Sequence, residues 1–327
     1  MESVIFPNDD NTFLLIPKEK FSSLCDTYKI RPYHESLFRS ISSFMIKTGI
    51  VKNNIIDLGA WIGDNSAPWA KIIDGIVYAI DPSENNCNFI KEIAKINNLD
   101  NIKVIQTAIS DKDEIISTND DMVHATFSQN DSGRNKIFST SLDNLMNKGD
   151  IKDIDYIHLD VEGMEYMVIK GAKELIDKYR PIIAYEIHLN LDIDKNDTIK
   201  KLLIESGYRI YLMNEILPGC RYDCRNVLAI PNERNPAYII DNIYNYLNNY
   251  DYKICLHTNN RFEILKFTNA KDAYYTFLLI KGGSYACVLV DKDNKILESY
   301  GLDTYVKYCE NHCKSIKIRD DFFIELK

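Results

Sequence analysis

Short apolar runs alternate with helical stretches along most of the chain, and this alternation limits the fold more than any other feature. Asn54–Leu58 and Ile76–Ile80 each read as a buried strand, and a helical stretch follows each of them. Strands and helices that alternate with short turns are typical of a parallel, doubly wound sheet. The pattern therefore predicts an α/β domain with further strands at Ile102–Ile105, Tyr156–Leu159, Pro181–Ile187, Tyr208–Met213 and Asn226–Ile230.

The 327 residues fit two domains, and the polar stretch Pro231–Pro236, with a proline at each end, marks the boundary between them. Before the α/β pattern, Phe13–Ile16 reads as a strand and His34–Met45 as an amphipathic helix that precedes Gly49. After the boundary, the pattern predicts a helix at Ala237–Tyr250 and strands at Phe262–Phe267, Tyr275–Ile280, Tyr285–Val290 and Ile316–Leu326. The predicted organisation is a preface at 1–50, the α/β domain at 51–231 and a small α+β domain at 236–327.

Composition argues against several classes of protein. The 39 basic and 48 acidic side chains give a net charge of −9, so the chain lacks the basic surface of a nucleic-acid binder and is not suited to an anionic membrane. No apolar run approaches the ~18 residues that span a bilayer, and residues 1–10 have no basic segment of a signal peptide. We therefore expect a cytoplasmic protein. Its high content of Asn, Ile, Lys and Tyr indicates an A+T-rich source, such as a virus in its host's cytoplasm.

The eight cysteines are scattered, which indicates reduced thiols in a chain without a signal peptide. Cys220 with Cys224, and Cys309 with Cys313, have the loose spacing C-x3-C. No histidine pair accompanies them, and the two pairs fall in different predicted domains. A structural zinc site is therefore not favoured.

The first candidate site is the turn after the first strand of the α/β domain, at Asp57–Asp64. Gly59 and Gly63 allow a ligand to approach the backbone and leave the N-terminus of the next helix open, although a tight turn without a ligand has the same pattern. Asp81 follows the second strand, where a carboxylate can accept hydrogen bonds from the two hydroxyls of a ribose. A solvated strand end is the alternative for Asp81, and Ser83 also suits a helix cap.

Acidic side chains also mark the ends of two later strands. Asp160 would point into the ligand cleft, whereas Glu165 suits the first turn of the following helix. Glu186 and His188 share one face of the next strand by alternation, beside Asp160. Asp160, Glu186 and His188 therefore form a candidate base or hydrogen-bond relay, although a histidine at a strand end is more often structural.

In order and spacing, these residues resemble the FkbM family of S-adenosylmethionine-dependent methyltransferases over about residues 35–231. The matching motifs are Ile56–Asp64, Ala79–Pro82, Thr107–Asp111, Ser141–Asp143, Asp160–Glu165, Lys170–Ala172 and Arg180–Glu186. Two residues depart from the family: Trp61 stands where Asn is commoner, and Asp81 where Glu is commoner. The segment after Pro236 is an extension with no recognised relative.

The resemblance implies a Rossmann-like class I methyltransferase fold with seven strands and S-adenosylmethionine across the strand ends. The glycine turn would lie beside the methionine part of the cofactor, Asp81 would bind both ribose hydroxyls, and the residues after the third strand would flank the adenine. The residues implied to bind the cofactor are Asp57, Gly59, Ala60, Gly63, Asp81, Ser83, Ala108, Ile109 and Asp160.

The family transfers methyl groups mainly to oxygen, so the resemblance implies a hydroxyl acceptor, with a sugar or glycan as first choice and another small molecule as the alternative. A hydroxyl needs a base or a metal to lose its proton. Asp160, Glu186 and His188 are the candidate catalytic residues, and Mg²⁺ held by Asp160 and Glu186 is an alternative that is not favoured. RNA cap-ribose methylation and a cofactor-binding scaffold without activity remain open, as does a homo-oligomer formed through the C-terminal domain.

Overall fold

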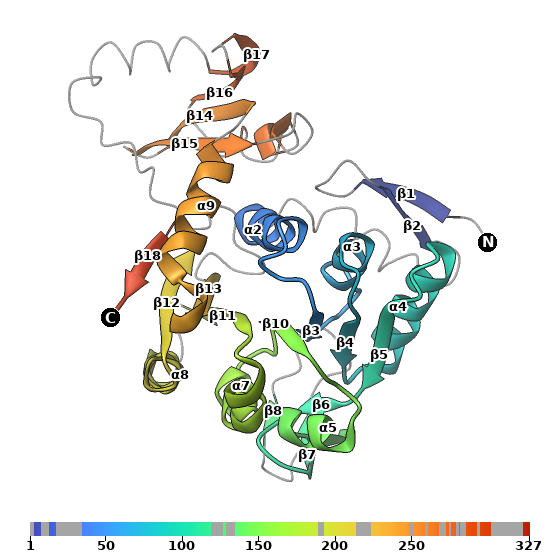
Figure 1. Ribbon diagram of the computed structural model, residues 1–327. Coiled ribbons are helices and arrows are strands. Elements are labelled where there is room, and N and C mark those ends of the chain that lie inside the picture. The colour runs from blue at the N-terminus through green and yellow to red at the C-terminus, as the bar shows by residue number, and fades with distance from the viewer. Residues whose placement is uncertain are drawn as a thin grey trace. The chain divides into compact units, whose positions relative to one another are not determined.

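A mostly parallel β-sheet forms the centre of one part of the protein, as the computed structural model in Figure 1 shows. Its parallel strands are β3 (Asn54–Leu58), β4 (Val77–Asp81), β5 (Ile102–Gln106), β10 (Ile154–Leu159) and β11 (Ile182–His188). Three antiparallel strands follow at one edge: β13 (Cys224–Pro231), β12 (Tyr208–Met213) and β18 (Phe323–Leu326). The order across the sheet is β18-β12-β13-β11-β10-β3-β4-β5.

The chain divides into two compact units. Residues 1–236 and 323–327 make up the first unit, and residues 237–322 the second. The structure describes residues 3–7, 13–17, 35–118, 127–128, 135–188, 193–213, 224–248, 251–258, 261–267, 273–274, 276–278, 281, 286–292, 295–301 and 323–327.

The strand order creates a switch point between β3 and β10. From β3 the chain moves outward through β4 to β5, and it then returns to β10 and β11 on the other side of β3. β3, β4 and β10 are buried along their whole length, as expected for parallel strands covered on both faces. The predicted doubly wound α/β fold is confirmed, but the described residues form a sheet of eight strands instead of the seven expected. Ligands of such folds bind beyond the carboxyl ends of the strands at this point.

Helices cover both faces of the sheet. They are α2 (Ser36–Lys47), α3 (Ser66–Ile72), α4 (Glu84–Ile96), α5 (Leu142–Lys148), α6 (Glu165–Lys170), α7 (Lys173–Tyr179) and α8 (Ile193–Glu205). Apolar side chains of α5 to α8 pack with Ile56, Leu58, Ile157 and Leu159 in one buried cluster, and α2 and α3 lie on the opposite face (Figure 1). None of the helices that the structure describes is long and apolar enough to cross a membrane.

Residues 165–179 form two separate helices, α6 and α7. The carboxylate of Asp143 accepts the backbone N–H groups of Glu174 (3.1 Å) and Leu175 (2.8 Å), which starts a new helix there. Gly171 lies in the gap between the helices, where a Cβ atom would come within 2.4 Å of the Ser110 carbonyl oxygen.

Two smaller sheets belong to the first unit. The hairpin of β1 (Ser3–Pro7) and β2 (Phe13–Pro17) confirms the strand predicted at Phe13–Ile16. The second is a sheet of order β6-β9-β7-β8, in which β7 and β9 are antiparallel. Its strands are β6 (Ala108–Ile109), β7 (Glu114–Thr118), β8 (Phe127–Ser128) and β9 (Asn135–Thr140).

The second unit has a helix and a four-stranded antiparallel sheet. α9 (Pro236–Asn248) confirms the predicted helix, and the strand order is β15-β14-β16-β17. The strands are β14 (Tyr252–Thr258), β15 (Arg261–Phe267), β16 (Ala286–Asp291) and β17 (Ile296–Tyr300). The strand predicted at Tyr275–Ile280 is wrong, because residues 276–278 are helical. Ala273 and Phe277, one helical turn apart, are both buried in the core of this unit.

The last strand of the chain returns to the central sheet. The small domain was predicted to run from 236 to 327, but β18 pairs with β12, from Ile210 opposite Leu326 to Met213 opposite Phe323. Residues 237–322 are therefore inserted between the seventh and eighth strands of the sheet. Phe323 is buried and packs edge-on against Tyr211, with 6.2 Å between the ring centroids. This contact stabilises the pairing of β18 with β12.

Phe323→Ala should lower the free energy of unfolding by about 3 kcal/mol, because it removes a buried aromatic side chain from β18. Ile324→Ala is the matched control, since Ile324 lies on the same strand but is 45% exposed, and its effect should stay below about 1 kcal/mol. Urea unfolding of the full chain measures both. Equal effects of the two substitutions would contradict the packing described for β18.

Candidate functional site

The glycine turn joins β3 to α3 through three residues with positive φ: Gly59 (+71°), Trp61 (+45°) and Gly63 (+74°). The N–H groups of Gly59 and Ala60 both donate to the carbonyl of Ile80, at 3.0 and 3.2 Å. A Cβ atom on Gly59 would lie only 1.8 Å from the carbonyl oxygen of Asp160. The close approach that was predicted for a ligand is thus made at Gly59 by the protein's own backbone.

Asp57 lies beneath this turn and is held from two sides. Its Oδ1 atom is 2.8 Å from Nδ1 of His158, and its Oδ2 atom accepts the hydroxyl of Ser66. Asp57 is 1% exposed. In the structure these contacts support the turn and the start of α3. The predicted contact of Asp57 with the cofactor stays a prediction.

His158 is a functional candidate that the sequence did not reveal. It stands opposite Asp57 in the parallel pair of β3 and β10, and its ring stacks on Phe38 at a centroid distance of 4.7 Å. Burial alone would lower the pKa of His158, but the hydrogen bond to Asp57 and the carboxylates of Asp57, Asp160 and Glu35 raise it above its ordinary value. The one available signal in the sequence was that His158 and Asp57 could lie on the same face of neighbouring strands. This becomes evident only when the pairing of β3 with β10 is known.

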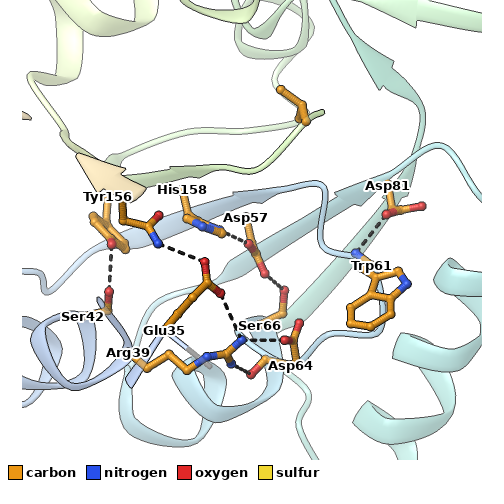
Figure 2. A network of polar contacts seen from close by, with 12 residues as sticks. Glu35, Arg39, Ser42, Asp57, Trp61, Asp64, Ser66, Asp81, Tyr156 and His158 are labelled. Carbon is orange, nitrogen blue, oxygen red and sulfur yellow. Dashed lines mark hydrogen bonds and ion pairs between the residues drawn. The ribbon is translucent and has the colours of Figure 1, made fainter. Parts of the chain in front are cut away.

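A second buried network runs from the start of α2 to the glycine turn (Figure 2). The guanidinium of Arg39 binds the carboxylate of Asp64 at 2.7 Å and its carbonyl at 3.0 Å. Glu35 lies 3.6 Å from Arg39 and accepts the side-chain N–H of Asn226 at 3.0 Å. The sequence reasoning missed this network, although an acid and an arginine four residues apart at the start of a predicted helix were a usable signal.

Asp81 ends β4 and is surrounded by neutral donors. Oδ1 accepts the N–H of Ser83 at 2.8 Å and the side chain of Asn86 at 3.1 Å, and Oδ2 accepts the N–H of Trp61 at 2.9 Å. Burial raises the pKa of this carboxyl to about 6. A carboxylate has about four acceptor positions, so the three protein donors leave room for about one more. Ser83 caps α4, because its hydroxyl accepts the N–H of Asn86 at 3.3 Å.

The loop after β10 is organised by Glu165. Its Oε1 atom accepts the N–H groups of Val161 and Gly163, each at 3.2 Å, and burial raises the pKa of this carboxyl to about 7. Glu162 and Gly163 have φ values of +50° and +95°, so Glu165 stabilises an unusual backbone turn. Asp160 stands at the start of this loop, and its N–H donates to the carbonyl of Leu58 at 3.1 Å.

Glu186 is buried near the end of β11, directly opposite Asn226 on β13. Ala184, two residues earlier on the same strand, is in register with His158. Alternation therefore places Glu186 on the same face of the sheet as His158. The backbone of His188 ends β11, and its side chain lies outside the described residues.

Ala108 and Ile109, predicted beside the adenine, form the short strand β6 that pairs with β9. Both are buried, and Ile109 packs into the main apolar cluster, so a ligand could reach mainly their backbone.

Among the described residues, no three His, Cys, Asp or Glu side chains are grouped so that they could hold a metal ion. Of the cysteines in the two C-x3-C pairs, Cys224 is buried, and the other three lie outside the described residues.

The strand order, the switch point and the glycine turn with an acidic residue after the second parallel strand define a class I methyltransferase fold. The family model described as "Methyltransferase FkbM domain" matches residues 57–254, more than half of the chain. The chain therefore belongs to the FkbM methyltransferase family, and the resemblance stated from the motifs is confirmed.

Several solved structures are similar to this chain. Methyltransferase FkbM from Methylobacillus flagellatus KT is 19% identical, with a TM-score of 0.41, over 54% of this chain and 43% of that one. A putative caffeoyl-CoA O-methyltransferase from Staphylococcus aureus is 14% identical, with a TM-score of 0.42, over 65% of this chain and 92% of that one. M. jannaschii TYW2 in complex with AdoMet is 13% identical, with a TM-score of 0.36, over 69% and 84%. The chain thus spans less than half of the first of these proteins, and no curated protein matches it.

Gly59→Ala should prevent stable folding or cost more than about 3 kcal/mol, because the new methyl group would collide with the Asp160 carbonyl. Gly149→Ala is the matched control: its φ is also positive (+79°), but no atom lies within 4 Å of the added Cβ. The control should cost about 1–2 kcal/mol. Thermal unfolding of both purified variants measures the difference, and a Gly59 variant as stable as the control would show that the turn can move away from Asp160.

Proposed function

We propose that the protein transfers the methyl group of S-adenosylmethionine to a hydroxyl oxygen of a sugar or glycan. Membership of the FkbM family supports methyl transfer. The observation that carries the choice of oxygen is the pair of acids on neighbouring parallel strands, Asp160 after β10 and Glu186 near the end of β11. Two carboxylates at this edge can orient a neutral hydroxyl and accept its proton.

The residues of the site fit S-adenosylmethionine, but some of them have other roles than those predicted. S-adenosylmethionine supplies an electrophilic methyl group on a sulfonium. Asp81 has room for about one ribose hydroxyl on Oδ2 instead of the two predicted. The backbone of the turn from Gly59 to Gly63 and of Ala108 and Ile109 would bind the remainder. Asp57, Ala60 and Ser83 act indirectly in this proposal, because they hold the turn and the start of α4.

The acceptor hydroxyl must lie in line with the bond between the methyl group and the sulfur. Holding it there supplies much of the rate. In the proposal, Asp160 or Glu186 would take the hydroxyl proton as the new carbon–oxygen bond forms and the carbon–sulfur bond breaks, so that the demethylated cofactor is the leaving group. The other carboxylate would orient the acceptor. A role for His188, a cytoplasmic location, a viral source and a homo-oligomer all remain predictions. A Mg²⁺ ion remains an alternative that is not favoured.

Asp81→Asn should weaken S-adenosylmethionine binding about ten-fold, because an amide is a poorer acceptor than a carboxylate for the ribose and for the N–H groups around it. The pKa near 6 adds a pH signature. As the pH falls from 7.5 to 5, the wild-type carboxylate becomes protonated and affinity should drop several-fold, whereas the variant should show little change.

Isothermal titration calorimetry at pH 7.5 and pH 5 measures the affinity of the wild type and the Asp81 variant for S-adenosylmethionine. Asp143→Asn is the matched control, because Asp143 also accepts two backbone N–H groups but does so at the start of α7. Unchanged affinity of the Asp81 variant would remove the ribose from this position.

Asp160→Asn and Glu186→Gln should each lower kcat about 100-fold or more, because they replace the proposed base while keeping its size. Affinity for S-adenosylmethionine should remain within about three-fold if these residues act mainly on the acceptor. Transfer of a tritiated methyl group to glycan and RNA fractions, with and without a chelator, measures activity. Labelling of RNA alone, or of nothing, would reject the glycan acceptor, and activity lost in chelator and restored by Mg²⁺ would favour the metal alternative.

A further inference from the structure

Four buried side chains form a continuous chain of contacts at the start of α2. Asn226 donates to Glu35 at 3.0 Å, Glu35 lies 3.6 Å from Arg39, and Arg39 binds Asp64 at 2.7 Å (Figure 2). Each of the four is at most 5% exposed. Burial of three charged groups in this way costs desolvation free energy, and a buried ion pair is often no more stable than apolar side chains of the same volume. A gain in stability is therefore a weak explanation for the presence of these four buried polar side chains.

The two ends of this chain of contacts lie at the two halves of the candidate site. Asp64 directly follows Gly63 in the glycine turn. Asn226 stands opposite Glu186 on the neighbouring strand. The first turn of α2 thus connects the proposed cofactor side with the proposed acceptor side.

The geometry of Arg39 is suited to fixing a backbone. Its two terminal nitrogens reach different parts of one residue, the carboxylate of Asp64 at 2.7 Å and its carbonyl oxygen at 3.0 Å. A planar guanidinium can hold both at once, whereas a lysine ammonium is a single point charge. The turn that ends here has Trp61 at a φ of +45°, and for a residue other than glycine such backbone persists only where neighbouring groups hold it.

We propose that Arg39, oriented by Glu35, is a positioning residue that holds the glycine turn in the conformation that binds S-adenosylmethionine. The inference rests on the proposed function, because it assigns this cofactor to the turn. Arg39 touches neither cofactor nor acceptor in this proposal, and it acts through Asp64.

Arg39→Lys tests the proposal, because it keeps the charge and loses the two-point contact. Affinity for S-adenosylmethionine should fall about ten-fold or more in calorimetry. In assays on the acceptor, KM for the cofactor should rise in parallel, while kcat at saturating cofactor stays within about three-fold of wild type. Hydrogen exchange of the backbone amides at residues 59–64 should become faster even without cofactor.

Arg234→Lys is the matched control. Arg234 also binds a carboxylate and a backbone carbonyl, those of Asp155 and Ile50, and Asp155 lies at the start of β10, away from the strand ends that form the site. Its replacement should leave cofactor affinity and the exchange of residues 59–64 unchanged. If Arg39→Lys does not fold, Glu35→Gln replaces it, since Gln can still accept from Asn226 but no longer pairs with Arg39, and affinity should fall about three-fold.

The outcomes separate the two proposals. Wild-type protein that binds no S-adenosylmethionine would reject the proposed function and this inference with it. Wild-type protein that binds the cofactor, together with an Arg39 variant that binds it equally well and differs only in melting temperature, would overturn the inference alone and leave Arg39 a structural residue.

Discussion

The candidate site depends on how closely two backbone segments pass each other at the switch point of the sheet. β3 and β10 pair in parallel, and the pairing continues past the end of β3, where the Asp160 N–H donates to the Leu58 carbonyl. The next residue of the turn, Gly59, has no room for a side chain beside the Asp160 carbonyl. This contact sets the position of Asp160 relative to the turn, so the same few atoms fix both the proposed cofactor side and the proposed acceptor side. A glycine here is required by the protein itself before any ligand is considered.

Several of the motifs that identify the family stabilise this fold through side-chain contacts. Lys170 pairs with Asp111 at 2.6 Å, and Asp143 caps α7 through the N–H groups of Glu174 and Leu175. Arg180, at the end of α7, binds Glu233. These contacts join segments far apart in the sequence, and they explain why short motifs with little chemistry can still mark a family. Their presence supports the fold more than it supports any particular acceptor.

The sequence was sufficient for the parallel sheet, since its strands are short apolar runs, and β3, β4 and β10 each end at or just before a glycine or an acid. It was not sufficient for β18, because pairing at an edge depends on the distant strand β12 and on contacts such as Phe323 with Tyr211. The acidic residues at the strand ends could be identified from the sequence, but the groups that bind them could not. His158 lies inside a strand that reads as apolar, and its pairing with Asp57 follows from the register of two strands about 100 residues apart.

The buried carboxylates of the site differ in how their charge is compensated, and this difference indicates which of them is open to a ligand. Asp57 has His158, whose pKa is raised, and Asp64 has Arg39. Asp81 has three donors among the described residues, and all three are neutral N–H groups, which leaves its pKa raised to about 6. A further donor would stabilise the Asp81 carboxylate more than either of the paired ones, because their charge is already balanced. This difference in charge compensation therefore supports the proposal that Asp81, rather than Asp57, receives the ribose.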